Sequence, residues 1–118
     1  MKGALDWLRV KLTRPVTITV TAEDIANGRA ANSQHCPVAL AARRAFSTLR
    51  LYVFAGGITV HPSDLTSELW ESDTNDLRNF VRSVDMGLEV QPTTFTVRLK
   101  DFRRYPIPRT FYLAPEPD

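Results

Sequence analysis

The stretch TTFTVRLK, residues 93–100, carries the clearest β-strand signal in the chain. Phe95, Val97 and Leu99 alternate with threonine and basic side chains, and this period of two is typical of a strand with one buried and one exposed face. Such a strand needs partner strands and a layer that covers its apolar face. The rest of the sequence indicates both.

Partner strands are indicated near the amino terminus. Apolar and polar residues alternate in residues 8–12 and again in residues 16–20, on the two sides of Pro15. Because proline cannot donate a ladder hydrogen bond, Pro15 either bends one long edge strand or separates two short strands. Residues 4–8 could instead form a short helical turn, and the sequence leaves both alternatives open.

A β-hairpin is indicated by the sequence LRLYVFAGGITVHP, residues 49–62. Its first strand should point Leu51 and Val53 to one face and Tyr52 and Phe54 to the other. The two runs are joined around Gly56-Gly57, a pair that suits a tight primed turn because glycine accepts positive φ angles.

Two helices should supply the covering layer. The first begins at Pro37, since proline is well placed at a first helical position, and runs to about Ser47 with small alanines at helical spacing. The second is capped by Thr74 or Asn75 and ends at Gly87. Its apolar stripe consists of Leu77, Phe80, Val81 and Val84.

Two shorter segments complete the local predictions. Thr21 can cap the amide of Asp24 in a short helix over residues 22–27, and Gly28 can close that helix in the left-handed conformation. Residues 62–72 are predicted to form a short turn that tucks three apolar side chains onto the core. These side chains are Leu65, Leu69 and Trp70.

The elements together predict one α+β domain over residues 1–104. It should contain an antiparallel or mixed sheet of four to five strands, with the two main helices packed on one face. Residues 105–118 hold four prolines among aromatic residues, and they are predicted to form an extended Pro/aromatic C-terminal arm. At 118 residues the chain fits a single domain.

Composition narrows the functional class. With 43% hydrophobic and 24% charged residues, the chain has the composition of an ordinary globular protein. No apolar run approaches the roughly 20 residues that span a bilayer, and the first 15 residues lack the features of a secretory signal. The single cysteine excludes an internal disulfide, so we expect a cytoplasmic protein without a membrane partner.

Cys36 is the sharpest candidate for chemistry. It precedes Pro37 at the start of a predicted helix, where the dipole stabilises a thiolate, and this position favours a thiol-dependent enzyme as a minor alternative. Its sequence neighbour His35 should point away, and His61 could approach only through the fold. The stronger interpretation is that Cys36 fills space between helix and sheet as a small apolar residue.

The sequence lacks the motifs that are typical of metal binding and phosphate binding. One cysteine and two histidines fall short of the four ligands of a structural zinc site, and no C-x-x-C spacing is present. The only glycine pair lies in the predicted hairpin, away from any phosphate-binding motif. We therefore expect no catalytic residues, no metal, no cofactor and no small-molecule substrate.

Charge is distributed unevenly along a chain of net charge +2. Residues 1–14 carry a net charge of +3 and residues 96–109 carry +4, whereas residues 63–89 carry −5. Arginines of the second basic segment could neutralise phosphates while nearby aromatic rings stack on bases, so nucleic-acid binding is the alternative function. The same basic residues could simply protect a strand edge from unwanted pairing.

A protein partner is the first hypothesis. Acidic residues surround Trp70 and could rim an exposed aromatic anchor, although such charges more often solvate a loop and the start of the next helix. Aromatic and arginine side chains dominate the energetics of protein interfaces. The candidate partner-binding residues are therefore Trp70, Phe102, Arg103, Arg104 and Tyr105.

Several motifs resemble an uncharacterised family of small bacteriophage and prophage proteins. The shared features are D-I-x-x-G, a C-P-V-A-L-A-x-x-R-A helix, a helix that ends in D-x-G, and a P-x-x-F strand. The matching positions are Asp24, Ile25, Gly28, Cys36–Leu40, Arg44, Ala45, Asp85, Gly87, Pro92 and Phe95. The resemblance covers most of residues 16–99. It implies a non-enzymatic protein of the host-cell cytoplasm that occupies a partner's surface, as an inhibitor of a bacterial defence complex or as a self-associating viral component.

Overall fold

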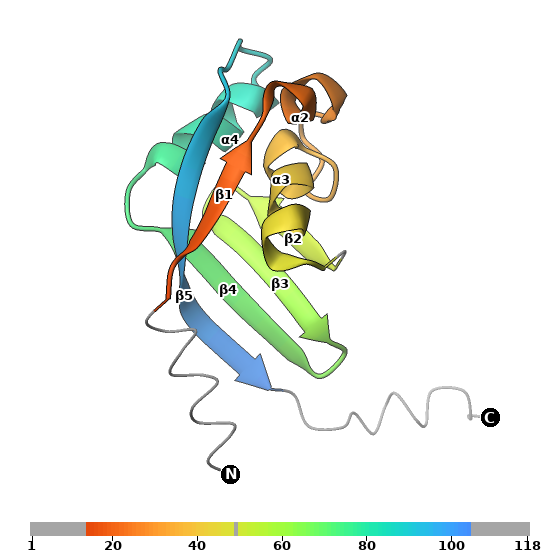
Figure 1. Ribbon diagram of the computed structural model, residues 1–118, viewed down its shortest axis with the longest axis vertical. Coiled ribbons are helices and arrows are strands. Elements are labelled where there is room, and N and C mark those ends of the chain that lie inside the picture. The colour runs from red at the N-terminus through yellow and green to blue at the C-terminus, as the bar shows by residue number, and fades with distance from the viewer. Residues whose placement is uncertain (1–13, 49, 105–118) are drawn as a thin grey trace, which may run out of the picture.

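The computed structural model describes residues 14–48 and 50–104, in which five strands and three helices form an α+β fold (Figure 1). The strands are β1 (Val16–Val20), β2 (Leu51–Phe54), β3 (Gly57–Ser63), β4 (Thr66–Ser72) and β5 (Thr93–Arg104). The helices are α2 (Ala22–Asn27), α3 (Pro37–Phe46) and α4 (Asp76–Asp85). The strands form one antiparallel sheet in the order β1-β5-β4-β3-β2. The predicted fold class is confirmed.

β5 is the longest strand and joins two parts of the sheet. Its residues 93–97 pair with β1, whereas its residues 97–104 pair with β4. The two edge strands, β1 and β2, both contact α3, so the sheet curls around this helix (Figure 1). Buried alanines on α3 let it approach the strands closely, as the sequence predicted.

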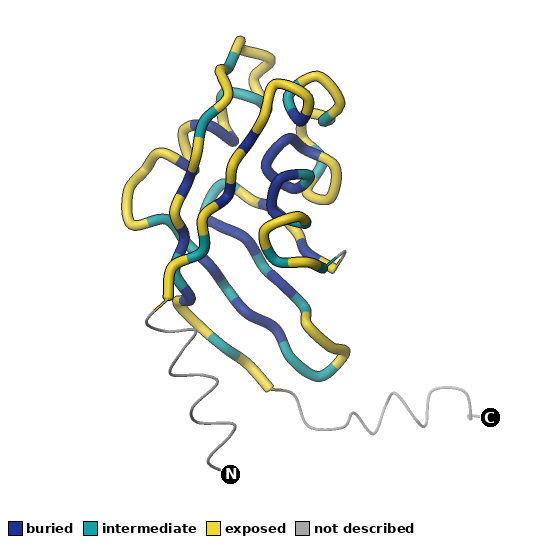
Figure 2. The backbone as a smooth tube through the Cα atoms, viewed as in Figure 1, coloured by how far each residue is buried: buried dark blue, intermediate teal, exposed yellow. Residues whose placement is uncertain are grey.

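One hydrophobic core lies between the sheet and the helices, and the buried stretches of the tube in Figure 2 follow it along the central strands and α3. Ring contacts tie the main helices to the sheet. Phe46 of α3 meets Trp70 at a centroid distance of 5.0 Å, and Phe80 of α4 meets Phe95 at 5.3 Å. Because both helices bury their apolar residues in this core, they cover the same face of the sheet.

The ends of α2 combine a confirmed and a wrong prediction. Thr21 and Asp24 form a capping box, with the Asp24 amide donating to Thr21 Oγ1 at 3.1 Å and the Thr21 amide donating to Asp24 Oδ2 at 2.9 Å. Gly28, however, is extended, with φ −75°. A side chain at Gly28 would lie 2.6 Å from the Pro37 ring, so close packing explains this glycine instead.

The β2–β3 hairpin forms without a primed turn. Phe54 pairs with Gly57, which leaves Ala55 and Gly56 as the connection, and neither Gly56 nor Gly57 has a positive φ. Gly57 is needed for another reason: a Cβ atom there would lie 2.4 Å from the carbonyl oxygen of Trp70 on β4. Gly57 is therefore explained by the close approach of β3 to β4, and not by the conformation of the turn.

Residues 66–72 form the central strand β4, where the sequence predicted a turn. Trp70 does reach the core, but it does so from a strand whose inward positions also include Glu68. Leu69 lies between them and points to the opposite face. A carboxylate at an inward position breaks the apolar alternation, so the strand pattern could not be recognised.

Some predictions fall on other parts of the chain. The strand expected over residues 8–12 and the arm over residues 105–118 lie outside the described residues. Within the described residues, no helix has the length and apolar character needed to cross a bilayer. The apolar stripe of α4 enters the core and Gly87 follows the helix with a left-handed φ of 75°, as predicted, but the N-cap residue Asn75 makes no capping hydrogen bond with its side chain.

Candidate functional site

Trp70 cannot serve as the exposed anchor that the sequence suggested. Its side chain is only 1% exposed, and its indole N–H donates to Glu68 Oε1 at 2.9 Å inside the fold. The reason is the central position of β4, which directs Trp70 toward the helices. The acidic residues of the same run therefore do not rim an exposed aromatic ring, and Trp70 is removed from the candidate site.

The remaining sequence-predicted residues are divided between different environments. Phe102 is half-buried against the core, whereas Arg103 and Arg104 are exposed and lie opposite Ser67 and Thr66 of β4. Because side chains alternate along a strand, Arg103 and Arg104 point to opposite faces of the sheet. Tyr105 lies outside the described residues.

Cys36 is a packing residue in this structure. It is the N-cap of α3, as predicted, but only 4% of it is exposed. Burial raises the pKa of the Cys36 thiol above its ordinary value, which is opposite to what a nucleophilic thiolate requires. In the described part of the chain, the imidazole of His35 is exposed and its Nδ1 lies 3.2 Å from Asn32 Oδ1, with no hydrogen bond to the thiol.

The face of the sheet that points away from the helices is a surface that the sequence analysis did not select. We call it the open face and define it by eight outward side chains of β2, β3, β4 and the second half of β5 that solvent reaches. These are Tyr52, Phe54, Thr59, Leu69, Glu71, Arg98, Asp101 and Arg103. All are exposed or half-buried. The alternation in residues 51–54 already separated the two aromatic residues from the core, and this was the available signal.

A groove crosses the open face. It lies between Phe54 on β2 and Arg103 on β5, it has a volume of about 310 Å³, and Thr59 and Leu69 contribute to its lining. Tyr52 and Phe54 are 41% and 43% exposed. Tyr52 also meets His61 edge-on at 5.6 Å, which orients its ring. Phe54 therefore forms an aromatic wall on one side of the groove, and Asp101 and Arg103 form a charged wall on the other.

The cations of this surface are paired with acidic neighbours. Arg98 Nε donates to Asp73 Oδ2 at 2.8 Å, and Lys100 Nζ lies 3.8 Å from the other oxygen of Asp73. Arg103 Nε lies 3.6 Å from Asp101 Oδ2. The charged wall is thus an alternation of both signs and has no large excess of positive charge.

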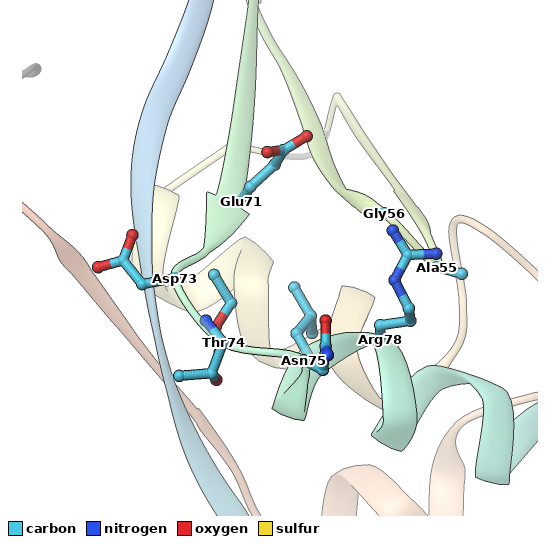
Figure 3. Close-up of a pocket in the computed structure, with 9 residues that line it drawn as sticks. Ala55, Gly56, Glu71, Asp73, Thr74, Asn75 and Arg78 are labelled. Atoms are coloured by element: carbon cyan, nitrogen blue, oxygen red, sulfur yellow. Dashed lines mark hydrogen bonds between the residues drawn. The ribbon is translucent and has the colours of Figure 1, made fainter.

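A second, polar hollow lies between the β2–β3 turn and the start of α4 (Figure 3). It has a volume of about 200 Å³, and Arg78 extends toward Gly56 on one side while Glu71 and Asp73 border the other sides. Arg78 is exposed, so its guanidinium is solvated and does not form a desolvated anion site in the hollow. The hollow offers no arrangement typical of catalysis.

Across residues 14–48 and 50–104, no three histidine, cysteine or acidic side chains are grouped so as to hold a metal ion. Comparison with protein-family models, with curated proteins and with solved structures finds no match to this chain. The resemblance to bacteriophage proteins therefore stays a prediction.

Proposed function

We propose that the chain is a non-enzymatic protein-binding module whose contact surface is the open face. The observation that supports this most strongly is the exposure of two aromatic rings on β2, Tyr52 and Phe54, of which Phe54 lies across a groove from Arg103. Aromatic and arginine side chains are enriched in protein interfaces and contribute most of their binding energy. Arg103 is thus retained from the sequence prediction, with new neighbours.

The surroundings of the aromatic rings support the same proposal. Leu69 is half-buried between polar residues, and Thr59 lies beside it in the register of the sheet. An apolar centre with a polar, charged border is the usual anatomy of a protein interface. The groove is open along the sheet, so it suits another protein surface better than an enclosed small molecule.

Nucleic-acid binding is the second candidate, favoured by the same aromatic rings because bases stack on exposed aromatic side chains. The ion pairs weaken it. Phosphate binding gains affinity when cations release the counterions of the nucleic acid, and Arg98, Lys100 and Arg103 already have carboxylate neighbours. The mixed charges fit a protein surface better.

The resemblance to bacteriophage proteins extends the proposal. In that setting the module would act in the cytoplasm of a host cell, where it would occupy a surface of a host or defence protein or join a viral assembly. Both roles require a stable scaffold with one exposed contact surface, which is the role we propose for the open face.

A capture experiment tests the proposed function. The tagged chain, a Tyr52→Ser/Phe54→Ser variant and a Met86→Ser control are incubated with a nuclease-treated bacterial lysate that also contains an untagged copy of the chain. Met86 is 71% exposed and lies outside the open face, so its variant controls for nonspecific hydrophobic binding. We expect proteins that bind the chain and the control but not the open-face variant. Equal capture by all three, no specific capture, or capture that only nucleic acid restores would contradict the proposal.

A further inference from the structure

We propose that the open face binds a second copy of this chain, around a two-fold axis that runs parallel to the strands between β3 and β4. This inference rests on the proposed function, because it takes the open face as the contact surface. Two sheets that pack face to face lie about 10 Å apart with their strands roughly aligned. In a two-fold dimer the same patch on both copies must be complementary to itself.

The register of the sheet shows this complementarity in a row of four residues. Tyr52 lies opposite Thr59, Thr59 opposite Leu69, and Leu69 opposite Asp101. Rotation about the axis exchanges the ends of the row, so Tyr52 faces Asp101 of the second copy. The phenol hydroxyl can then donate to a carboxylate. In the middle of the row, Leu69 faces Thr59 of the second copy, which supplies a methyl group.

The next row repeats the match with different chemistry. Phe54 lies opposite Gly57, and Glu71 lies opposite Arg98. Gly57 and Glu71 are neighbours across β3 and β4, since a Cβ atom built on Gly57 would lie 3.0 Å from Glu71 Cγ. The same rotation places Phe54 over Arg98 of the second copy. Because Arg98 uses Nε for Asp73, the flat face of its guanidinium stays available to stack on an aromatic ring.

The charges of the open face favour a second copy, and the stagger of the sheet bears on where the two-fold axis lies. The cations Arg98, Lys100 and Arg103 have acidic neighbours, so two identical faces approach without the repulsion that surfaces of one sign would produce. The staggered sheet also disfavours a two-fold axis along β4. Rotation about β4 itself would place Tyr52 beyond β5, where β1 has no opposing residues because it pairs only with residues 93–97.

The size of the surface predicts a weak dimer. Four strands spaced by about 4.8 Å, with about six residues on average, give roughly 400 Å² of projected sheet in each copy. With side chains included, the interface falls near the lower limit of specific complexes, about 1,200 Å² in total. We therefore expect a dissociation constant on the order of 10–100 µM and a population of dimers that grows with concentration.

Analytical ultracentrifugation of the full chain over a concentration series tests the inference. We expect the mass to rise from the monomer value of 13.3 kDa toward twice that value. Phe54→Ser and Arg98→Glu should each weaken association at least about tenfold, because a two-fold interface loses each contact twice. Met86→Ser should leave association unchanged. A chain that remains monomeric up to about 1 mM, far above the expected dissociation constant, would overturn the inference.

Cross-linking distinguishes this dimer from others. In a Cys36→Ser background, Thr59→Cys places a thiol beside the axis, whereas Thr17→Cys places one on β1 of the same sheet, outside the overlap. A short bismaleimide should join two Thr59→Cys chains and leave Thr17→Cys chains single. Equal cross-linking of both variants would refute the axis. If the chain is monomeric but the open face still captures another protein, the inference fails while the proposed function stands; if neither is observed, both fail.

Discussion

Replacing Arg44 by alanine should remove a clamp that joins β1, α2 and α3. The Arg44 guanidinium donates to both carboxylate oxygens of Asp24, at 2.8 and 2.6 Å, and to the carbonyl oxygen of Thr19 at 3.1 Å. The Asp24 side chain is only 6% exposed, so Arg44→Ala leaves a nearly buried carboxylate without its cation. Hydrogen bonds to charged groups contribute about 1.5–3 kcal/mol each. Because the Arg44 side chain is 55% exposed, solvent screening reduces the total, and we expect the free energy of unfolding to fall by about 2 kcal/mol.

Arg50→Ala provides a matched control. Arg50 also pairs with an aspartate, Asp64, but the two side chains are 56% and 79% exposed. Exposed ion pairs contribute little, so this variant should lose less than about 0.5 kcal/mol. Urea unfolding of the chain and both variants, with unchanged m-values, measures the difference. Equal losses in the two variants, or an Arg44→Ala loss below about 0.5 kcal/mol, would refute the argument from burial.

The same clamp predicts a pH dependence. The hydrogen bonds from Arg44 hold the pKa of Asp24 below its ordinary value of 3.8, against the effect of burial, which raises it. A carboxyl with a lowered pKa in the folded state stabilises the fold fully above its unfolded pKa, and this contribution is lost as the pH falls through the folded pKa. The stability difference between the chain and Arg44→Ala should therefore be constant near neutral pH and should shrink below about pH 4.

One chemical treatment and three substitutions test the packing. Cys36 should resist alkylation at neutral pH until urea unfolds the chain, since it is 4% exposed and its pKa is raised; rapid native labelling would contradict this. Gly57→Ala should cost more than about 2 kcal/mol in urea unfolding, because its Cβ would meet backbone at 2.4 Å, whereas Gly87→Ala has open space around it and should cost about 1 kcal/mol for its positive φ. Trp70→Phe should lower the free energy of unfolding by about 2 kcal/mol, because it loses the hydrogen bond to Glu68. The folded variant should still capture the partner, and a folded variant that captures nothing would return Trp70 to the candidate site.

The strands and helices that the sequence predicted share one property, which is a complete local pattern. Phe95, Val97 and Leu99 alternate without interruption, and the stripe on α4 recurs at helical spacing, so each pattern is recognisable without any knowledge of its partners. β4 lacks such a pattern. Glu68 is buried at an inward position and bonded to Trp70, and this favourable pairing exists only once the strand has been placed in the sheet.

The candidate site was harder to predict than the fold because it depends on register. Tyr52, Leu69 and Asp101 are far apart in the sequence and form one row only through three pairs of neighbouring strands. The sequence did separate Tyr52 and Phe54 from the core side of β2. It could not place Arg103 across a groove from Phe54, since that requires β4 to lie between β3 and β5. Because β4 was not recognised from the sequence, the open face could not be predicted either.

The staggered sheet separates the groups that hold the fold together from those that we propose bind a partner. The Arg44 clamp lies at β1 and the first half of the chain, whereas the open face lies on β2 to β4 and the second half of β5. Substitutions at distant sites without shared partners have nearly additive effects on stability. Tyr52 and Phe54 keep about two fifths of their surface in solvent, so shortening them removes little of the buried core. A loss of binding in their variants can therefore be assigned to the contact surface, because the scaffold that presents this surface is stabilised elsewhere.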